Sequence, residues 1–318
     1  MLENSMFGDA FQSDLAIEEV KENSHDRIAE FLARRKFQKL TGGVFNFALA
    51  PRYKLAQVIA EKAPQYDRVY VLFLNTAFTT VRYPVGILES YRKKWPNTRY
   101  ILYYIDPIGR GVSLYAKYLQ DSNLFDAVYT FDPYDAKKYG LIHWKTPYSR
   151  VMDHNIKATH DLYFIGIETD RLEQICAVLK KGSENAASMK MDIIQLQERQ
   201  ELTEFSDCVR LHGATDIIPY MDALEHTLDA RCILELVRPK QAGLTLRAYE
   251  AVVYNRKLLT NNKSILDFKY YDPTNMQYFE KVEDIDWQWV KQPVTVGYDY
   301  KGDFSPILLL EDIARRFP

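Results

Sequence analysis

Cysteine is scarce in this chain. Only three of its 318 residues are cysteine, and because three is an odd number a framework of disulfide bonds is not expected. Cys176, Cys208 and Cys232 also lack the short, paired spacing that binds zinc. We therefore expect three reduced thiols, which is typical of a cytosolic protein.

Strong net charge and long apolar runs are absent as well. The 41 basic and 43 acidic residues give a net charge of −2, which argues against a nucleic-acid-binding protein. No apolar run approaches the roughly 18 residues of a membrane span. Residues 1–9 show no basic stretch followed by an apolar one, so a signal peptide is not expected. These absences predict a soluble protein whose contact with a membrane, if any, is peripheral.

Several catalytic motifs are also missing. The chain has no G-x-G-x-x-G, no Walker P-loop, no H-E-x-x-H and no G-x-S-x-G. This gives little support to a dinucleotide enzyme, an ATPase, a zinc hydrolase or an esterase. One D-x-D occurs, at Asp284 and Asp286, but it follows no buried strand and lies in an acidic run. We interpret it as a solvated face and predict no metal site.

The chain does contain enough residues for two domains, and many aromatic ones. A single hydrophobic core rarely serves more than about 250–300 residues, so a length of 318 indicates two domains. Aromatic residues make up 14% of the chain and include 23 tyrosines. A tyrosine combines an apolar face with a polar tip, which suits wet clefts and sugar-binding surfaces. Ordinary packing is still expected to account for most of them.

The first half alternates between apolar runs and amphipathic stretches. Three runs are typical of strands buried on both faces of a parallel sheet, at residues 68–75, 99–106 and 125–131. Helices are expected at residues 85–94 and 113–119, and another begins after Asp132, which Pro133 follows. Residues 1–40 are polar and are also expected to be helical. The pattern predicts a doubly wound, Rossmann-like sheet.

A polar break at residues 145–159 separates this half from a second α/β pattern. We place the boundary so that residues 1–155 form the first domain and residues 156–318 the second. The second domain is expected to contain strand 161–167, helix 170–181, strand 190–196, helix 220–228, strand 232–237, strand 257–259 and a last helix at about 305–317. Gly166 lies inside the first of these strands, where a glycine marks a close approach to the backbone.

The most specific candidate site lies at residues 238–250. Gly243 falls in a loop that leads into a helix carrying Arg247 and Glu250. The N–H groups and the dipole of a helix N-terminus favour an anion, so we expect the diphosphate of a nucleotide sugar here. Arg247 would contact a phosphate, and Glu250 would accept hydrogen bonds from the ribose. The alternative is that these two residues, three apart on one helix face, only form a surface ion pair.

Other polar residues complete the expected donor site. Arg238 and Lys240 would neutralise phosphate charge, and Gln241 and Thr245 would hydrogen-bond to the phosphates or to the sugar. His212 precedes a glycine in a predicted loop of the same domain and would border the cleft. The six histidines show no metal-ligand spacing, so each on its own is more often a packing or surface residue.

Ligands of open parallel sheets bind outside the carboxyl ends of the strands. In the first domain Asn75 and Asp106 stand at such ends, and Arg110 follows among glycines. We expect these three residues on the acceptor side of the site, although Asn75 and Asp106 have an alternative role in ending a strand. Asp132, at a third strand end, is expected to cap a helix instead because Pro133 follows it.

Several stretches together resemble one family of enzymes. They are Tyr103–Asp106, Val128–Leu141, Asp161–Gly166, Ile233–Leu236, Gln241–Ala251 and Lys257–Asn262. From about residue 65 onward, the chain resembles GT-B glycosyltransferases of bacterial lipopolysaccharide, capsule and exopolysaccharide biosynthesis, and the run Q-x-G-L-T-x-R-x-x-E-A is the most specific match. The resemblance implies an α/β fold of two tandem Rossmann-like domains, with a C-terminal helix that crosses back to the first. Residues 1–64 show no resemblance.

The resemblance also implies a reaction. A sugar would pass from a UDP-, GDP- or CMP-linked donor, bound by the second domain, to a saccharide or lipid-linked acceptor held by the first. Retaining members carry two glutamates eight residues apart, whereas Ala242 stands eight residues before Glu250, which favours inversion. Asp106 is then the expected base for the acceptor hydroxyl, and Lys240, Arg247 and the helix N-terminus would stabilise the leaving diphosphate. No cofactor and no metal is expected.

Two other functions remain open at this point. The chain could be a non-catalytic, GT-B-like subunit of a glycosyltransferase complex, or a different GT-B enzyme such as an epimerase or a polyol-phosphate transferase. The oligomeric state is also open. We expect a cytoplasmic protein, and a lipid-linked acceptor would bring it to the inner membrane through basic patches at residues 34–36 and 92–95.

Overall fold

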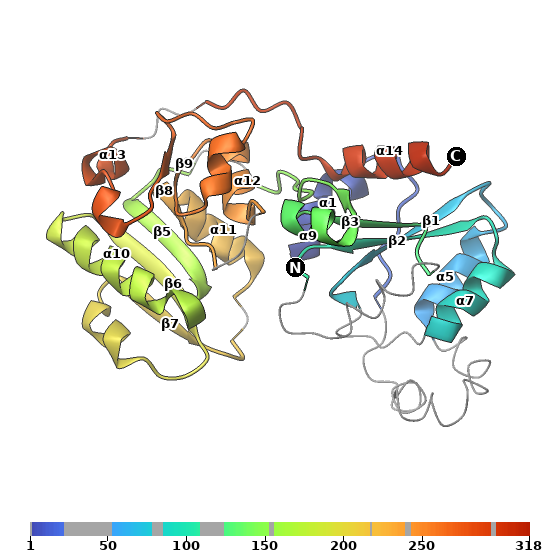
Figure 1. The fold of residues 1–318 in the computed structure, drawn as a ribbon, viewed down its shortest axis with the longest axis horizontal. Coiled ribbons are helices and arrows are strands. Elements are labelled where there is room, and N and C mark those ends of the chain that lie inside the picture. Colours follow the sequence, from blue (N-terminus) through green and yellow to red (C-terminus); the bar gives the residue numbers. More distant parts are fainter. Residues whose placement is uncertain are drawn as a thin grey trace. The chain divides into compact units, whose positions relative to one another are not determined.

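The computed structural model describes most of the chain. The described residues are 2–21, 53–77, 85–108, 124–152, 156–216, 218–238, 243–293 and 297–318. They form two compact units, each with its own parallel sheet (Figure 1). The N-terminal unit comprises Asp14–Lys145 and Leu309–Pro318, and the C-terminal unit comprises Met1–Ser13 and Thr146–Leu308. The predicted α/β fold of two Rossmann-like domains is thereby confirmed.

The two ends of the chain are exchanged between the units. The N-terminal residues 1–13 belong to the C-terminal unit, and the C-terminal residues 309–318 belong to the N-terminal unit. The first helix, α1 (Leu2–Phe11), is held in the C-terminal unit, where Asp9 N donates to Ser149 Oγ at 2.9 Å. The last helix, α14 (Pro306–Arg316), lies from Leu309 onward in the N-terminal unit. It is the crossing helix that the resemblance implies.

The division between the units falls at Lys145–Thr146. The sequence analysis places the boundary between residues 155 and 156, at the far end of the polar break. The difference arises because the start of this break already pairs with the C-terminal unit. Tyr148 N donates to the carbonyl of Phe304 at 2.8 Å.

Four parallel strands form the sheet of the N-terminal unit, in the order β1-β2-β3-β4. They are β1 (Val69–Leu74), β2 (Thr98–Tyr104), β3 (Ala127–Thr130) and β4 (Ile142–His143). Among its described residues this unit also has the helices α5 (Lys54–Lys62), α7 (Val85–Lys94) and α9 (Pro133–Tyr139), besides α14. β1 and β3 lie within the apolar runs that predict them, and β2 begins one residue before its predicted run. β2 is buried along almost its whole length.

Asp132 caps α9, as its position before a proline predicts. Its carboxylate accepts hydrogen bonds from Tyr134 N at 2.8 Å and Asp135 N at 3.1 Å. These bonds satisfy N–H groups that have no partner inside the helix. The side chain therefore has a structural task and is not offered to a ligand.

Six parallel strands form the sheet of the C-terminal unit, in the order β10-β9-β8-β5-β6-β7. They are β5 (His160–Ile167), β6 (Met189–Gln195), β7 (Val209–Gly213), β8 (Ala230–Glu235), β9 (Lys257–Thr260) and β10 (Met276–Tyr278). Counted from the first strand of the unit, this is the Rossmann order. β5 and β8 are neighbours, although β6 and β7 lie between them in the chain, and the strand order reverses there.

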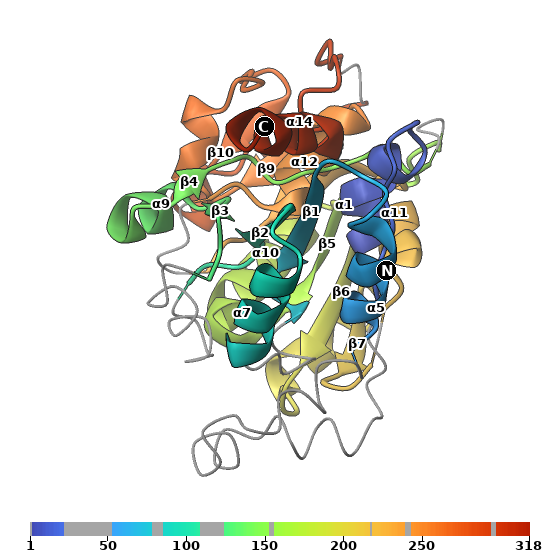
Figure 2. The same ribbon diagram turned by 90° about the vertical axis from the view of Figure 1, so that its right-hand side faces the viewer.

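Helices cover both faces of this sheet (Figure 2). They are α10 (Leu172–Glu184), α11 (Tyr220–Leu228), α12 (Leu246–Val253) and α13 (Trp287–Lys291). Alternate residues of β8 point to opposite faces. Cys232 and Leu234 share a core with α10 and α13, whereas Ile233 shares one with α11 and α12. The sheet is therefore buried on both sides, as its apolar strands predict.

Some elements differ from the prediction. Helix α1 ends at Phe11, and the described residues that follow it up to residue 21 are not helical. The remainder of the helix expected within residues 1–40, and the helix expected at 113–119, lie outside the described residues. The sequence patterns do not predict β7, because this strand lies at the sheet edge and its polar residues stay largely exposed.

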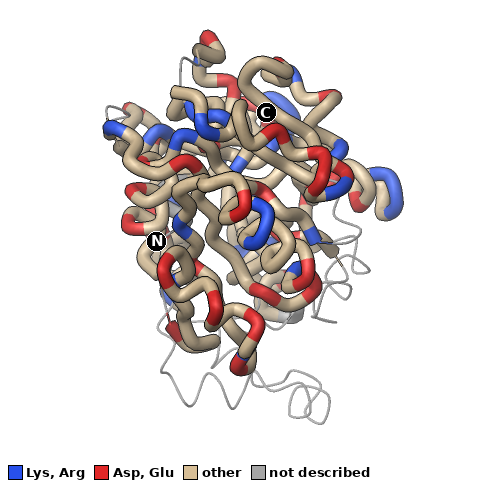
Figure 3. The backbone as a smooth tube through the Cα atoms, turned by 90° about the vertical axis from the view of Figure 1, so that its left-hand side faces the viewer, with Lys and Arg blue, Asp and Glu red and all other residues tan. Residues whose placement is uncertain are grey.

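Charged positions of both signs are interspersed along the chain (Figure 3), which agrees with its small net charge. Within the described ranges, no helix has the length and apolar character needed to cross a bilayer. The same part of the chain contains no group of three or more His, Cys, Asp or Glu side chains placed to hold a metal ion.

Candidate functional site

The topology of the C-terminal unit marks one place for a ligand. β5 and β8 lie side by side where the strand order reverses, and we call the carboxyl ends of these strands the switch point. The helices that follow them pack on opposite faces, α10 in one core and α12 in the other. Ligands of open α/β sheets bind at such a point. The residues that follow β5 and β8 are therefore the first candidates for a binding site.

Arg171, between β5 and α10, spans the switch point. Its Nη1 donates to the carbonyl of Leu236, just after β8, at 2.7 Å, and its Nη2 donates to the carbonyl of Ile167 at 2.6 Å. The guanidinium also lies 5.5 Å from the centre of the Phe164 ring. Gly166 leaves room for it, since a Cβ atom there would stand 2.7 Å from Nη2. The close approach that this glycine indicates in the sequence is that of Arg171.

A second arginine, Arg238, lies close enough to act on the charge of Arg171. Burial lowers the pKa of Arg171 to about 10, and repulsion from Arg238 is the next largest cause. Asp170 and Glu168 oppose this with smaller effects. Among the residues that the structure describes, neither guanidinium forms an ion pair with a carboxylate. Two neighbouring arginines without such a partner favour the binding of an anion.

The segment between β8 and α12 is fixed at both ends by the residues that follow β9. Near its start, Val237 N donates to Asn261 Oδ1 at 2.7 Å. Near its end, Asn262 Nδ2 donates to the carbonyl of Gly243 at 3.1 Å. The two asparagines thus hold the backbone on either side of the predicted diphosphate loop. The run Leu258–Asn262 therefore supports the loop that contains Gly243 through its two asparagines.

The predicted loop residues are only partly described. Thr245 caps α12, and its Oγ1 accepts a hydrogen bond from Arg247 N at 3.2 Å. Gly243 is buried. Lys240 and Gln241 lie outside the described residues, so their predicted contacts with a phosphate stay predictions. At the start of α12, the N–H group of Arg247 is therefore already hydrogen-bonded to the Thr245 cap.

β8 ends in a buried acid, Glu235, which the sequence analysis does not single out as a site residue. Its carboxyl group is hydrogen-bonded to the hydroxyl groups of Thr245 and Thr260, and Thr245 N donates to it at 3.3 Å. Burial raises the pKa of Glu235, and the bonds from the two threonines oppose that rise. Glu235 lies at the switch point, but its side chain points into the protein interior.

Arg247 and Glu250 are brought together inside the unit. Arg247 Nη1 lies 2.5 Å from Glu250 Oε2 and donates to Thr227 Oγ1 at 3.0 Å, while Tyr220 Oη donates to Glu250 Oε1 at 2.8 Å. Glu250 is fully buried, and only 17% of the Arg247 side chain is exposed. Burial raises the pKa of Glu250, which Arg247 partly offsets. The pair is internal, unlike the surface pair considered from the sequence, and a ribose would reach Glu250 only if the pair opened.

His212 lies in β7 and not in a loop, and it turns towards a buried acid. Its Nε2 is 2.8 Å from Asp192 Oδ1, and His226 Nδ1 is 2.9 Å from the other oxygen of that carboxylate. Tyr163 Oη also donates to Asp192, at 2.8 Å. Burial acts to raise the pKa of Asp192, but the hydrogen bonds from His212, Tyr163 and His226 outweigh it and lower the pKa. His212 is therefore engaged within the unit, two strands away from β5.

In the N-terminal unit the structure brings Asn75 and Asp106 together. Asn75 follows β1 and is fully buried. Its Nδ2 donates to Asp106 Oδ2 at 3.3 Å, and its Oδ1 accepts from Ile105 N at 2.7 Å. Asp106 itself is exposed. An exposed carboxylate held by a buried amide suits a general base. Arg110, the third residue expected on the acceptor side, lies outside the described residues.

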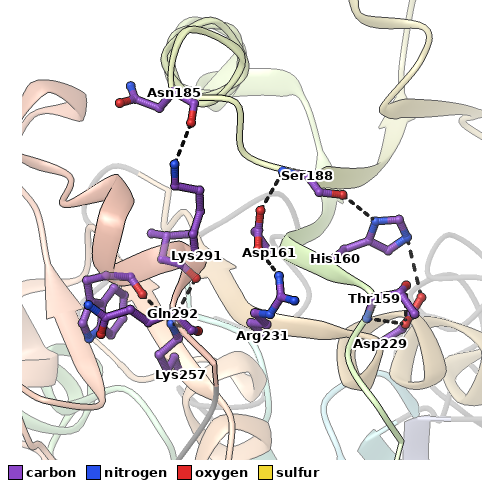
Figure 4. A network of polar contacts seen from close by, with 12 residues as sticks. Thr159, His160, Asp161, Asn185, Ser188, Asp229, Arg231, Lys257, Lys291 and Gln292 are labelled. Atoms are coloured by element: carbon purple, nitrogen blue, oxygen red, sulfur yellow. Dashed lines mark hydrogen bonds and ion pairs between the residues drawn. The ribbon is translucent and has the colours of Figure 1, made fainter.

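The amino ends of the strands in the C-terminal sheet have a different character (Figure 4). Asp161 there accepts a hydrogen bond from Ser188 N at 2.8 Å and forms an ion pair with Arg231. Lys257 is buried and donates to three carbonyl groups at the end of α13, at 2.5, 3.0 and 2.8 Å. The cation is thereby placed at a helix C-terminus, which it stabilises. Asp161, Arg231 and Lys257 thus each have a partner of opposite polarity at the amino ends of the strands.

The D-x-D sequence proves to be a helix start. Asp286 caps α13 by accepting hydrogen bonds from Gln288 N and Trp289 N, both at 3.0 Å. Asp284 accepts from Lys281 N at 2.9 Å. Both carboxylates are exposed, and their hydrogen bonds account for their positions as turn and cap residues.

No family model matches the sequence, and no curated protein matches it. Solved structures share its fold. The structure of TarM has 12% sequence identity and a TM-score of 0.52 over 83% of this chain and 58% of that one. An alpha-glucosyltransferase in complex with UDP has 9% identity and a TM-score of 0.51 over 83% and 84%. The catalytic domain of starch synthase IV from Arabidopsis thaliana, bound to ADP and acarbose, has 8% identity and a TM-score of 0.50 over 86% and 78%.

These structures are GT-B glycosyltransferases, and the likeness shows that this chain has the GT-B fold. The chain spans 58% of the length of TarM. Fold alone does not fix an activity, which resides in particular residues. The residues at the switch point and at Asp106 must therefore carry the functional argument.

Arg171 is the candidate that the sequence analysis misses. It stands in a predicted helix whose polar residues look like an ordinary solvated face. The signal that could have found it is Gly166, a glycine inside a buried strand with an arginine shortly after the strand end. A side chain long enough to fold back over that glycine explains both residues together.

Proposed function

We propose that the protein is a glycosyltransferase that moves a sugar from a nucleotide-sugar donor to an acceptor. The observation that carries this proposal is a pair of arginines at the switch point: Arg171, which donates to the carbonyl of Leu236, and Arg238, which lies on the segment that leads to α12. Cationic side chains and backbone N–H groups at a helix start suit the diphosphate of a leaving group. Two structures of the same fold hold such nucleotides, since one is in complex with UDP and another is bound to ADP.

The proposed reaction is a single displacement that inverts the anomeric centre. Asp106 takes the proton of the acceptor hydroxyl while the hydroxyl oxygen attacks the anomeric carbon, and Asn75 holds the carboxylate in place. The bond from the sugar to the diphosphate breaks, and the electron pair leaves with the nucleotide. Arg171, Arg238 and Lys240 stabilise that negative charge. Because side chains supply the positive charge, the proposed reaction is independent of a metal.

The internal pair changes the proposed roles of two predicted residues. Arg247 holds Glu250 in the interior and orients the first turn of α12, in place of touching a phosphate directly. The donor site then consists of Arg171, Arg238 and the segment that Thr245 ends, with Gln241 as a further predicted contact. His212 supports this site from β7 through its bond to Asp192, in place of bordering the ligand.

The acceptor is proposed to be a saccharide or a lipid-linked saccharide of cell-surface polysaccharide biosynthesis, as the family resemblance implies. Such an acceptor places the protein in the cytoplasm, with peripheral contact to the inner membrane. Lys93 and Lys94, at the end of α7, contribute to the proposed contact, whereas the neighbouring Arg92 is ion-paired with Asp126 at 2.9 Å. Co-sedimentation with vesicles that depends on anionic lipid is the expected result.

A non-catalytic partner subunit is the second candidate function. The observation that favours it is the burial of Glu250, because the acidic residue expected to hold the ribose is committed to an internal ion pair. A subunit that has kept the fold but lost the donor-binding site would bind no nucleotide. The two functions therefore differ in one measurable property.

Calorimetric titration of the purified protein with UDP, GDP and CMP separates these candidates. We expect one nucleotide to bind, and its sugar donors then go into a product assay by mass spectrometry with saccharide and lipid-linked acceptors. Asp106→Asn should lower turnover by about 10²–10⁴-fold, the usual contribution of a general base, and leave nucleotide affinity unchanged. Absence of binding for every nucleotide would establish the scaffold in place of the enzyme.

A further inference from the structure

Glu235 is an acid in an unexpected place. It ends β8 at the switch point, where the proposed donor site gathers positive charge for an anion. The side chain is almost fully buried, and it is bonded to the hydroxyl groups of Thr245 and Thr260 and to the backbone N–H of Thr245. An acid that close to a diphosphate would repel it if the acid were charged. The arrangement therefore calls for an explanation.

The bonds of Glu235 join three parts of the C-terminal unit. Thr245 is the cap of α12 and the last residue of the segment after β8. Thr260 is the last residue of β9. Glu235 itself is the last residue of β8. Its carboxyl group thus fastens the far end of the segment to the carboxyl ends of two neighbouring strands.

The two asparagines after β9 extend this arrangement. Asn261 accepts from Val237 N at 2.7 Å, and Asn262 donates to the carbonyl of Gly243 at 3.1 Å. Together with Glu235 they fix three points of the backbone around the proposed phosphate seat. Arg171 adds a fourth point, because it donates to the carbonyl of Leu236 at 2.7 Å.

Burial acts against the charged form of Glu235, and the hydrogen bonds from the two threonines act in its favour. Burial raises its pKa, and its oxygens meet hydroxyl groups instead of a cation. A neutral carboxyl group can donate to one threonine and accept from the other. It then holds the segment without placing a negative charge under the anion.

We propose that Glu235 is a positioning residue of the donor site, which ties Thr245 and the start of α12 to the carboxyl ends of β8 and β9. This rests on the proposed function, because it assumes that the segment seats a nucleotide diphosphate. Its structural half does not depend on any ligand. The two halves are therefore tested separately.

The first experiment measures amide hydrogen exchange in the free protein. Glu235→Ala should increase exchange at Val237 and Thr245, whereas Glu235→Gln, which keeps one donor and one acceptor, should leave it close to wild type. Asp161→Asn is the matched control, because Asp161 is a buried acid that joins elements at the opposite edge of the same sheet. It should raise exchange there and not at residues 237 and 245. Unchanged exchange at these residues in Glu235→Ala would overturn the proposal.

The second experiment measures affinity for the nucleotide found by calorimetry, and the KM and kcat of its sugar donor. Glu235→Ala should weaken nucleotide binding about tenfold, as expected for a lost hydrogen-bonded support, and raise the donor KM more than it lowers kcat. Glu235→Gln should stay within about threefold of wild type by the same reasoning. Equal affinity in wild type and Glu235→Ala would overturn the positioning role. If wild type binds no nucleotide, the proposed function fails while the exchange result still decides the structural half.

Discussion

In the C-terminal sheet, charged side chains are arranged differently at the amino ends and at the carboxyl ends of the strands. At the amino ends of the strands, Asp161 is paired with Arg231, and Lys257 is surrounded by carbonyl groups at the end of a helix. At the carboxyl ends, Arg171 and Arg238 repel each other. The nearby acid, Glu235, faces hydroxyl groups instead of these arginines. The same six strands thus separate amino ends, where Asp161, Arg231 and Lys257 are each partnered, from carboxyl ends, where two arginines lie close to each other.

This difference indicates which ends of the strands can bind an anionic ligand. Paired charges at the amino edge stabilise the sheet and leave nothing for a ligand. Neighbouring arginines at the carboxyl edge cost stability in the free protein, and an anion would relieve that cost. Stabilisation by a ligand is therefore expected to depend on residues of one edge only. Variants of residues at the two ends of the strands test this contrast.

The largest expected effect concerns Arg247. This residue was expected to bind a phosphate, but in the structure it is paired with a buried acid. Arg247→Ala leaves Glu250 buried without a cationic partner, so the free energy of unfolding should fall by about 3–5 kcal/mol. Denaturant titration measures this fall. The double variant Arg247→Met with Glu250→Gln should recover much of the loss, because no uncompensated charge stays buried. A stable Arg247→Ala protein that no longer binds nucleotide would instead assign Arg247 to the donor site.

Arg171 gives the next largest effect, and it tests the contrast directly. Arg171→Met removes a charged donor from the proposed anion site, so nucleotide affinity should fall by a factor corresponding to about 2–3 kcal/mol. Arg231→Met at the amino edge is the control. It should lower the unfolding free energy and leave nucleotide affinity, measured by calorimetry, unchanged. Equal affinities for the two variants would remove the proposed division between the edges.

Gly166 offers a smaller and more selective perturbation. In Gly166→Ala the new Cβ atom would meet Arg171 Nη2 at 2.7 Å and Phe164 Cζ at 2.9 Å, so the arginine must move. Both neighbours are ends of side chains, and the fold should therefore persist. We expect about a tenfold loss of nucleotide affinity, or ~1.4 kcal/mol. In an Arg171→Met background the same change should have little further effect, and an additive loss would contradict the explanation.

The smallest expected effect is the pH dependence that Glu235 contributes to stability. Burial raises its pKa above the usual value of 4.5, so the stability it contributes is present below about pH 4.5 and is lost as the pH rises through the raised pKa. Glu235→Gln removes this loss. Urea titrations at pH 5 and pH 8 should show a smaller fall in unfolding free energy for the variant than for wild type. The difference should be about 1.4 kcal/mol for each unit by which the raised pKa exceeds 5.

Elements buried on both faces were predictable from sequence because their apolar character is continuous. The strands β2, β5 and β8 follow this rule. Helices α7 and α11 agree with the expected residues 85–94 and 220–228. The edge strand β7 was not predictable in this way, because exposed edge residues need not be apolar. Burial thus leaves a signal in composition, whereas position at a sheet edge leaves little.

The candidate site was less predictable for a different reason. The sequence indicates that Gly243, Thr245 and Arg247 share one segment, but not the direction in which each side chain points. Arg247 faces inward because Glu250, one helical turn later, offers it a buried partner. Arg171 reaches the site from a part of the chain far from that segment, through a conformation that no local pattern specifies.

The exchange of chain ends between the units limits how the protein can be divided. A fragment of residues 146–318 would lack α1, so Ser149 would lose the bond from Asp9. The complementary fragment of residues 1–145 would lack the C-terminal helix, and with it the contact of Asp312 with Tyr129 at 2.9 Å. Truncation at the obvious midpoint therefore damages both halves at once. Neither half of the sequence therefore contains a complete unit.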